Sequence, residues 1–187
     1  MIYREGLNLS LLNKKELFEQ GMIVCDEFLS KNNIKPPIII AKNFDNNVKE
    51  KGCYYYHDKI IHVNFSKCRL PVKTPGYSWT YPGYKADLTP MGVLAHEMGH
   101  HIDNLNNLYN LMPKTPKVSG YEPNNKEIVA ETLRLFILNP DLLRIISFNR
   151  YKFLNERFVP VITQTWEEVL VNAHIKFKNT INKNFIK

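Results

Sequence analysis

The sequence predicts a single α+β domain, in which one helix and a small twisted mixed sheet come first and a mostly helical part follows. A length of 187 residues fits one domain with a sizeable core. Short β-branched segments gather between Ile38 and Phe65, whereas beyond Thr89 apolar residues recur mainly at helical spacing. We therefore expect one domain over residues 1–187, with an upper part of about 1–104 and a lower helical part of about 105–187.

The first third of the chain predicts one helix and one strand. Residues 10–32 have apolar positions at approximately helical spacing, and Ser10 is a plausible N-cap. After Pro36-Pro37, the run Ile38-Ile39-Ile40-Ala41 is typical of a strand covered on both faces. The Asn- and Lys-rich residues 43–52 predict a loop.

A β-hairpin is predicted next. Its arms are Cys53–Tyr56 and Ile60–Phe65, and His57-Asp58-Lys59 forms the turn. The second arm is the more apolar, which indicates an inner strand paired with the edge strand Cys53–Tyr56. Residues 66–87 show neither period and contain four aromatic residues, which either line a cleft or form a satellite core: Tyr77, Trp79, Tyr81 and Tyr84.

The helix that follows has a clear start signal. Thr89 can act as N-cap, and Pro90 would take the first helical position, where its missing N–H costs nothing. Gly99 weakens a helix by about 1 kcal/mol relative to Ala, which indicates that another backbone packs closely there. Further helices are predicted from Asn124 or Asn125 to Leu138, from Leu142 to about Asn155, and from Pro160 onward.

Charge and composition are consistent with a soluble globular protein. The net charge of +7 and the pI near 9.2 favour acidic partners or nucleic acid, but the lysines are scattered and no nucleic-acid-binding motif is present. No segment resembles a transmembrane span or a secretory signal, so we expect a cytoplasmic protein without membrane contact. Three cysteines, Cys25, Cys53 and Cys68, form no C-x-x-C pair, and ordinary packing is favoured over a Cys53–Cys68 bridge or a metal ligand.

The strongest functional signal is His96-Glu97-Met98-Gly99-His100. On a helix, side chains four residues apart leave the same face, so both imidazoles can reach one Zn²⁺ ion. Glu97 would lie beside the metal as general base. The alternative, a surface helix with incidental histidines, is disfavoured because the motif coincides with a clear helix start.

A catalytic zinc site needs a third protein ligand, and the next helix offers two carboxylates one turn apart, Glu127 and Glu131. One can bind the metal while the other orients a ligating histidine. Other histidines are weaker candidates. His57 and His62 are isolated, and His101 points about 100° away from His100, so we expect it on the helix surface or behind a ligand.

Residues 90–136 resemble gluzincin-type zinc metallopeptidases related to the catalytic domain of anthrax lethal factor, and also similar phage-encoded domains. The resemblance lies in His96-Glu97-Met98-Gly99-His100-His101-Ile102-Asp103 and in the segment from Tyr121 to Phe136, which contains Glu127-Ile128-Val129-Ala130-Glu131. It implies a zincin-like fold with His96, His100 and Glu127 as zinc ligands, Glu97 as base, and Tyr121 as oxyanion stabiliser. Tyr121 lies one residue closer to Glu127 than the family pattern.

The sequence therefore leads us to expect a zinc-dependent endopeptidase that acts on proteins or peptides, with substrate bound along the edge strand Cys53–Tyr56. Glu131 is expected to support a ligating histidine. Two alternatives belong to other classes: a nucleic-acid-associated protein, including a protease of DNA-bound proteins, and a zinc-stabilised binding module without catalysis. The sequence does not indicate an oligomeric state.

Overall fold

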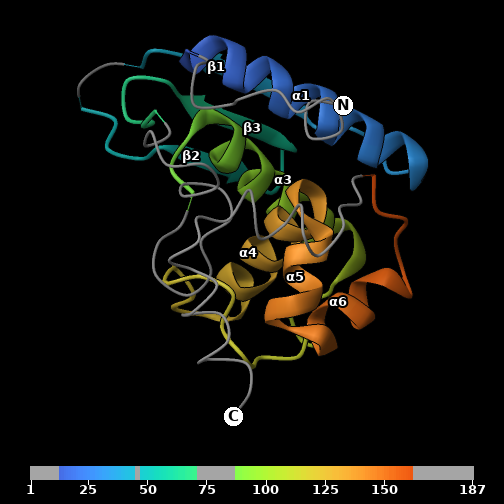
Figure 1. Cartoon of the computed structure of the whole chain (residues 1–187). Coiled ribbons are helices and arrows are strands. Elements are labelled where there is room, and N and C mark those ends of the chain that lie inside the picture. The colour runs from blue at the N-terminus through green and yellow to red at the C-terminus, as the bar shows by residue number, and fades with distance from the viewer. Residues whose placement is uncertain (1–12, 45–46, 71–86, 162–187) are drawn as a thin grey trace.

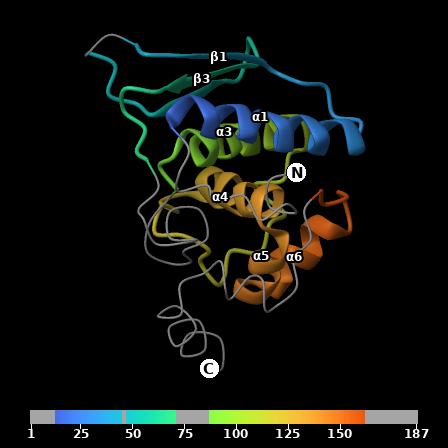
Figure 2. The same ribbon diagram turned by 45° about the horizontal axis from the view of Figure 1, so that its top comes forward.

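The computed structural model describes residues 13–44, 47–70 and 87–161, and it has the α+β architecture that the sequence predicts. A small sheet lies on one side of α1 and α3, and the remaining helices lie on the other side (Figures 1 and 2). The elements are α1 (Lys14–Lys31), β1 (Ile38–Lys42), β2 (Gly52–Tyr55), β3 (Ile60–Asn64), α3 (Pro90–Asn106), α4 (Asn125–Leu138), α5 (Pro140–Ile146) and α6 (Phe148–Asn155).

The sheet has the strand order β1-β3-β2 and is mixed. β1 runs parallel to β3, with Ile38 opposite Ile60, while β2 and β3 form the predicted antiparallel hairpin, with Tyr54 opposite Ile61. The more apolar arm of the hairpin is therefore the central strand and β2 is an edge strand, as predicted. The sequence analysis predicts that substrate binds along this edge strand.

The prediction that Ile38–Ala41 is covered on both faces is wrong. Along β1 the residues alternate between exposed and half-buried, and Ile38 is 60% exposed. The physical reason is the position of β1 at the outside of a sheet that the described helices cover on one side only (Figure 2). Four consecutive apolar residues do not by themselves show whether one face or both are covered.

Helix α1 begins later than predicted. Its N-cap is Asn13, whose side chain accepts hydrogen bonds from the backbone N–H groups of Lys15 and Glu16, and the Glu16 carboxylate accepts one from Asn13 N–H in return. This capping box competes with the start that we expected at Ser10, which lies outside the described residues. The apolar face of α1 packs against α3 through Gly21, whose position lies next to the Met91 backbone.

Helix α3 begins as predicted. The Thr89 hydroxyl accepts a hydrogen bond from Gly92 N–H at 3.1 Å, and Pro90 is the first helical residue. The helix lies between the sheet and α4, and its residues from Pro90 to Asp103 are buried except for His96, which is partly buried. A helix so enclosed holds its side chains in fixed directions, which suits a site that needs defined geometry.

The helices after α4 differ from the prediction in one respect. The predicted helix from Leu142 to Asn155 is two helices, α5 and α6, which are separated at Ser147 by a residue of extended φ and ψ 82°. The cause is long-range: Arg150 on α6 is fully buried and bonded to Glu122, which fixes the direction of α6. The predicted helix from Pro160 and the aromatic residues of the 66–87 loop lie outside the described residues.

Two further expectations concern membranes and thiols. Within the described residues, no helix has the length and apolar character needed to cross a bilayer. Cys25, Cys53 and Cys68 are all free thiols, and burial raises the pKa of Cys25 and of Cys68 to about 12. The preference for ordinary packing over a disulfide is confirmed.

Candidate metal centre

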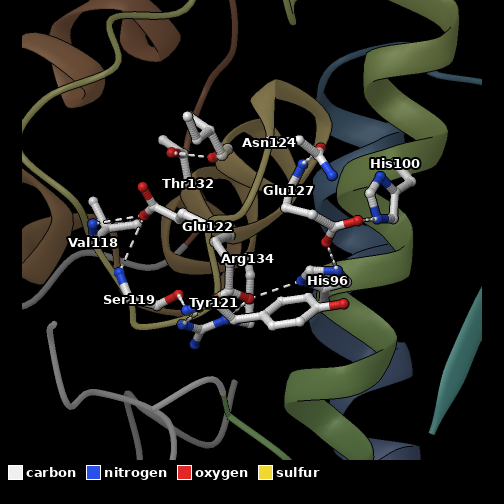
Figure 3. A network of polar contacts seen from close by, with 12 residues as sticks. His96, His100, Val118, Ser119, Tyr121, Glu122, Asn124, Glu127, Thr132 and Arg134 are labelled. Carbon is white, nitrogen blue, oxygen red and sulfur yellow. Dashed lines mark hydrogen bonds and ion pairs between the residues drawn. The ribbon is translucent and has the colours of Figure 1, made fainter. Parts of the chain in front are cut away.

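Two helices bring together the three side chains that the sequence assigned to metal binding. His96 and His100 come from one face of α3, and Glu127 comes from the first turn of α4 (Figure 3). Each offers one ligand atom, and the three atoms lie within 4.8 Å of one another. Among the described residues, these three form the group of His, Cys, Asp and Glu side chains that could hold a metal ion. Neither His57 nor His62 belongs to this group. The set could hold one metal ion.

The Glu127 carboxylate lies between the two imidazoles. Its Oε2 is 3.0 Å from His96 Nε2, and its Oε1 is 3.5 Å from His100 Nε2. Oε2 is nevertheless a buried atom without a partner of hydrogen-bond geometry among the described residues. The ligand atoms of the three side chains converge, and two imidazoles plus one carboxylate are a donor set of the kind that binds zinc.

The close approach of α4 to α3 depends on Gly99, which lies between the two histidines in sequence. A Cβ at this position would be 2.8 Å from both the Cα and the carbonyl oxygen of Ala130. Ala130 lies between Glu127 and Glu131. The tight contact inferred from Gly99 is therefore present, and it occurs where α4 must present its carboxylates to α3.

Glu131 lies behind His96 and fixes its ring. His96 Nδ1 donates a hydrogen bond of 2.7 Å to Glu131 Oε1, which leaves Nε2 directed at the candidate metal position. Arg134 donates two hydrogen bonds of 3.0 Å to the same carboxylate. Both Glu131 and Arg134 are buried, and a buried carboxylate requires such pairing. Glu127 thus faces both imidazoles, whereas Glu131 contacts His96 from the Nδ1 side. Their ligand and supporting roles stay predictions.

The charges at this centre are strongly coupled. Burial alone would raise the pKa of Glu127, but contacts with His100 and His96 outweigh it and lower this pKa to about 2. Burial raises the pKa of Glu131 as well, and the Arg134 guanidinium and His96 outweigh it, so the net shift is downward. For His96, burial lowers the pKa, whereas the two carboxylates raise it to about 10 without a metal. The centre therefore favours a bound positive charge.

Glu97 is placed differently from the ligand carboxylate. It is 7% exposed, and burial raises its pKa, an effect that His96 and His100 partly offset. Its Oε1 would lie 2.6 Å from a Cβ at Gly52, so the first residue of β2 must be small for the strand to pass over this carboxylate. Glu97 also lines the cavity beside the centre. A raised pKa makes the carboxylate a stronger base, which suits it to proton transfer.

Tyr121 lies beside His96, with ring centroids 5.8 Å apart, and it is 49% exposed (Figure 3). Burial of part of the ring and the nearby carboxylates of Glu127 and Glu97 raise the pKa of its phenol, so the hydroxyl keeps its proton. Tyr121 N–H donates to Ser119 Oγ at 3.0 Å. The one-residue shift in sequence thus still leaves the phenol at the site.

The loop that carries Tyr121 is held by a buried ion pair that sequence reasoning missed. Glu122 accepts hydrogen bonds from the backbone N–H groups of Val118 and Ser119, and it is paired with Arg150 at 3.1 Å. Arg150 also donates to the Lys114 carbonyl and to Thr132 Oγ1. Nothing local in the sequence indicates this network, because its members come from the 113–122 loop, α4 and α6.

His101 is not on the helix surface, which was one of the two positions expected for it. It is fully buried, and its Nε2 donates to the Lys35 carbonyl at 2.8 Å while its Nδ1 accepts from the Tyr54 hydroxyl at 3.0 Å. Burial lowers the pKa of His101, which favours the neutral ring that this pattern needs. His101 therefore links α3 to the chain before β1 and to β2, and it takes no part in the ligand set.

Comparisons with protein-family models, with curated proteins and with solved structures give no match to this chain. The class of site therefore rests on the geometry described above and on the sequence motif. The resemblance to gluzincins remains a prediction.

Proposed function

We propose that the protein is a zinc-dependent endopeptidase of the gluzincin type. The observation that carries the proposal is the convergence of His96, His100 and Glu127 to within 4.8 Å, with Glu97 directly beside them on α3. A structural zinc site has four protein ligands, whereas a catalytic site keeps a position open for water or substrate. Three convergent side chains next to a cavity of about 280 Å³ support the catalytic type.

Zinc held there would supply Lewis acidity to the scissile carbonyl group. Glu97 is the group suited to take a proton from the attacking water and to pass it to the leaving amine, because its carboxylate faces the cavity and burial raises its pKa. The phenol of Tyr121, which also lines the cavity, is suited to donate a hydrogen bond to the oxyanion. Glu131 and Arg134 hold the His96 ring in position.

The substrate would be an extended peptide that pairs with β2. This strand is an edge of the sheet, and its first residue, Gly52, lies over Glu97. Backbone hydrogen bonds to such an edge give affinity that does not depend on sequence, and side-chain pockets then give specificity. A peptide-like inhibitor that binds without pairing to β2 would contradict this part of the proposal.

The test combines metal content with cleavage. Protein purified without added metal, or after zinc addition, should contain one zinc per chain, and it should cleave members of a peptide library. Glu97→Gln should retain zinc and lose about 10²- to 10⁴-fold in kcat, as expected for removal of a general base. Tyr121→Phe should lower kcat with unchanged zinc content. Glu19→Gln, at an exposed position on α1, is the matched control.

Three outcomes would reject the proposal in different ways. A folded protein that never retains a transition metal would reject the metal centre. A zinc-loaded protein that cleaves nothing in a broad library would indicate a zinc-stabilised binding module. Cleavage by Glu97→Gln at the wild-type rate would reject the assigned mechanism.

A further inference from the structure

One face of the sheet lies toward α1 and α3 (Figure 2), and a cavity of about 290 Å³, the outer cavity, lies on the other face. Tyr54 is buried, and its hydroxyl donates a hydrogen bond to His101 of α3. Its neighbours Cys53 and Tyr55 therefore point to the opposite face, because successive side chains of a strand alternate. Both line the outer cavity together with His62, which lies opposite Cys53 on β3.

Aromatic rings form the walls of the outer cavity. The Phe44 and His62 rings are stacked with centroids 5.0 Å apart, and the Tyr55 ring meets His62 edge-on at 4.8 Å. The buried Asn64 side chain accepts a hydrogen bond from Phe44 N–H and donates one to the Glu50 carbonyl, which ties both residues to β3. The cavity therefore has fixed walls that can contact a ring or a large aliphatic group.

The outer cavity and the cavity beside the candidate metal centre lie against the same stretch of chain. Glu50, Lys51 and Gly52 line both of them. A Cβ on Gly52 would point at Glu97, on the metal side, whereas Cys53 lines the outer cavity. The start of β2 therefore separates a cavity at the candidate centre from a cavity on the outer face of the sheet.

The free edge of β2 presents the backbone groups that would bind a peptide strand. Asn64 N–H donates to the Lys51 carbonyl, and in an antiparallel pair the residues that exchange hydrogen bonds alternate with those that do not. Cys53 is therefore bonded to β3, while Gly52 and Tyr54 direct their N–H and C=O groups toward the free edge. A peptide strand bonded to Gly52 and Tyr54 places the residue between these contacts directly opposite Cys53.

The side chain of that peptide residue points to the outer face. Residues directly opposite each other in paired strands project to the same side, and non-hydrogen-bonded pairs bring side chains closest, with Cα atoms about 4.5 Å apart. Because Cys53 lines the outer cavity, a long side chain opposite it enters the same space. The two neighbouring peptide side chains point instead toward α3 and the candidate centre.

We propose that the outer cavity is a substrate subsite for an aromatic or large aliphatic side chain, carried by the peptide residue opposite Cys53. This inference rests on the proposed peptidase function. In an antiparallel peptide, this residue comes directly before the residue opposite Gly52, beneath which Glu97 lies. The subsite and the candidate metal centre would thus receive adjacent residues of one bound peptide, on opposite faces of the sheet.

The polar groups at the outer cavity do not select a charged substrate. Glu50 and Lys51 line it with opposite charges, and Lys42 Nζ lies 5.1 Å from the Phe44 ring centroid. Among the described residues of the lining, no buried polar side-chain atom is left without a hydrogen-bond partner. An uncharged side chain that is long enough to reach the rings is therefore preferred.

The experiment uses peptides that carry phenylalanine, leucine or alanine at one position at a time around the scissile bond. At the position opposite Cys53, kcat/KM of the wild-type protein should favour phenylalanine over alanine by about 10- to 100-fold, the equivalent of burying one large apolar side chain. Cys53→Phe fills the cavity with a ring of its own and should remove this preference. Ile38→Ala, at an exposed position on β1 outside the lining, should leave the preference intact.

Phe44→Ala tests the same subsite if Cys53→Phe does not fold. It removes one wall and should lower the ratio of phenylalanine to alanine cleavage at the same peptide position only. A merely structural effect would change cleavage of all peptides alike. Circular dichroism verifies that each variant is folded, and light scattering verifies that its oligomeric state is that of the wild type.

A labelling measurement requires no turnover. Peptides that carry a cysteine pyridyl disulfide at successive positions are incubated with zinc-loaded Glu97→Gln, and the mixed disulfide is located by mass spectrometry. Labelling of Cys53 should be fastest from the position opposite it, because a non-hydrogen-bonded pair has a Cα separation that fits a disulfide. A shift by one residue moves the group to the other face. Cys25 and Cys68 are buried, and Cys53→Ser verifies the labelled site.

The outcomes separate the subsite from the proposed function. Labelling from the same peptide position that prefers phenylalanine supports the subsite. Peptide cleavage whose preferences do not respond to Cys53→Phe or Phe44→Ala, or labelling that does not depend on position, overturns the subsite and leaves the peptidase proposal standing. A changed oligomeric state of Cys53→Phe with unchanged preferences assigns the face to a second copy of the chain and also overturns it. Absence of both cleavage and labelling overturns the two proposals together.

Discussion

Replacement of Gly99 by Ala should damage metal binding more than it damages folding. The added Cβ would lie 2.8 Å from the Ala130 backbone, and backbone atoms cannot move aside as a flexible side chain can. Relief requires α3 and α4 to separate locally by roughly 0.7–1.2 Å, because optimal carbon–carbon contact is about 3.5–4.0 Å. His96 and His100 flank this contact on α3, and Glu127 lies one turn before Ala130 on α4.

Two effects on stability oppose each other. Ala favours a helix over Gly by about 1 kcal/mol, whereas overpacking costs about 1–3 kcal/mol. The free energy of unfolding of the metal-free protein should therefore fall by only about 0–2 kcal/mol. Metal–ligand distances tolerate only about ±0.2 Å, so the separation should weaken zinc binding by at least the roughly 10- to 100-fold typical of a lost supporting contact.

The assay is a competitive zinc titration alongside urea unfolding of the metal-free protein. Gly21→Ala is the matched control, because a Cβ at Gly21 meets the Met91 backbone at 3.1 Å in the α1–α3 contact rather than in the contact between α3 and α4. It should leave zinc affinity unchanged. Wild-type zinc affinity in folded Gly99→Ala would refute the claim that this contact sets the ligand geometry.

Three further predictions concern single side chains. Glu127→Gln should weaken zinc binding more than Glu131→Gln, for which the expected loss is about 10- to 100-fold. Glutamine is chosen because it keeps a side chain of the same size in contact with Arg134. If the measured zinc affinities have the reverse order, the ligand and supporting roles of the two residues must be exchanged. Arg150→Met should lower the free energy of unfolding by about 3–5 kcal/mol, because it leaves Glu122 buried without its partner; a urea midpoint close to that of wild type would contradict this. Burial raises the pKa of Asp87 from 3.8 to about 7, so the folded protein binds this proton more tightly than the unfolded chain does. Relative to Asp87→Asn, wild type should lose stability as pH rises from about 4 to 7, by at most roughly 1.4 kcal/mol per pH unit, and parallel pH profiles of the two proteins would contradict the assignment.

Features with local physical causes could be predicted from the sequence. Thr89 and Pro90 define the start of α3 because capping depends on adjacent residues only. The motif spacing places His96 and His100 on one face, and the glycine between them indicates a close backbone neighbour. The apolar character of Ile60–Asn64 indicates the central strand because a strand between two others is the more buried.

Features with long-range causes could not be predicted. The break at Ser147 carries no Gly or Pro, and it follows from the burial of Arg150 against Glu122, which is 28 residues away in sequence. Arginine and glutamate are ordinarily surface residues, so sequence alone assigns them to solvent. The same reasoning allowed His101 a position on the helix surface, which is wrong, because its partners, Tyr54 and the Lys35 carbonyl, come from the first third of the chain.

The pairing of His96 with two carboxylates has a consequence for the protein after chelation. The His96 ring lies between Glu127 and Glu131. In its protonated form it carries a positive charge, which offsets the negative charge of these carboxylates in place of a metal ion. A protonated His96 would therefore offset part of the repulsion between the carboxylates of α3 and α4 in a metal-free centre. We expect the chelated protein to be a resting form that keeps its assembled ligand set, and to recover by exchange of a proton for a cation without passing through an unfolded state.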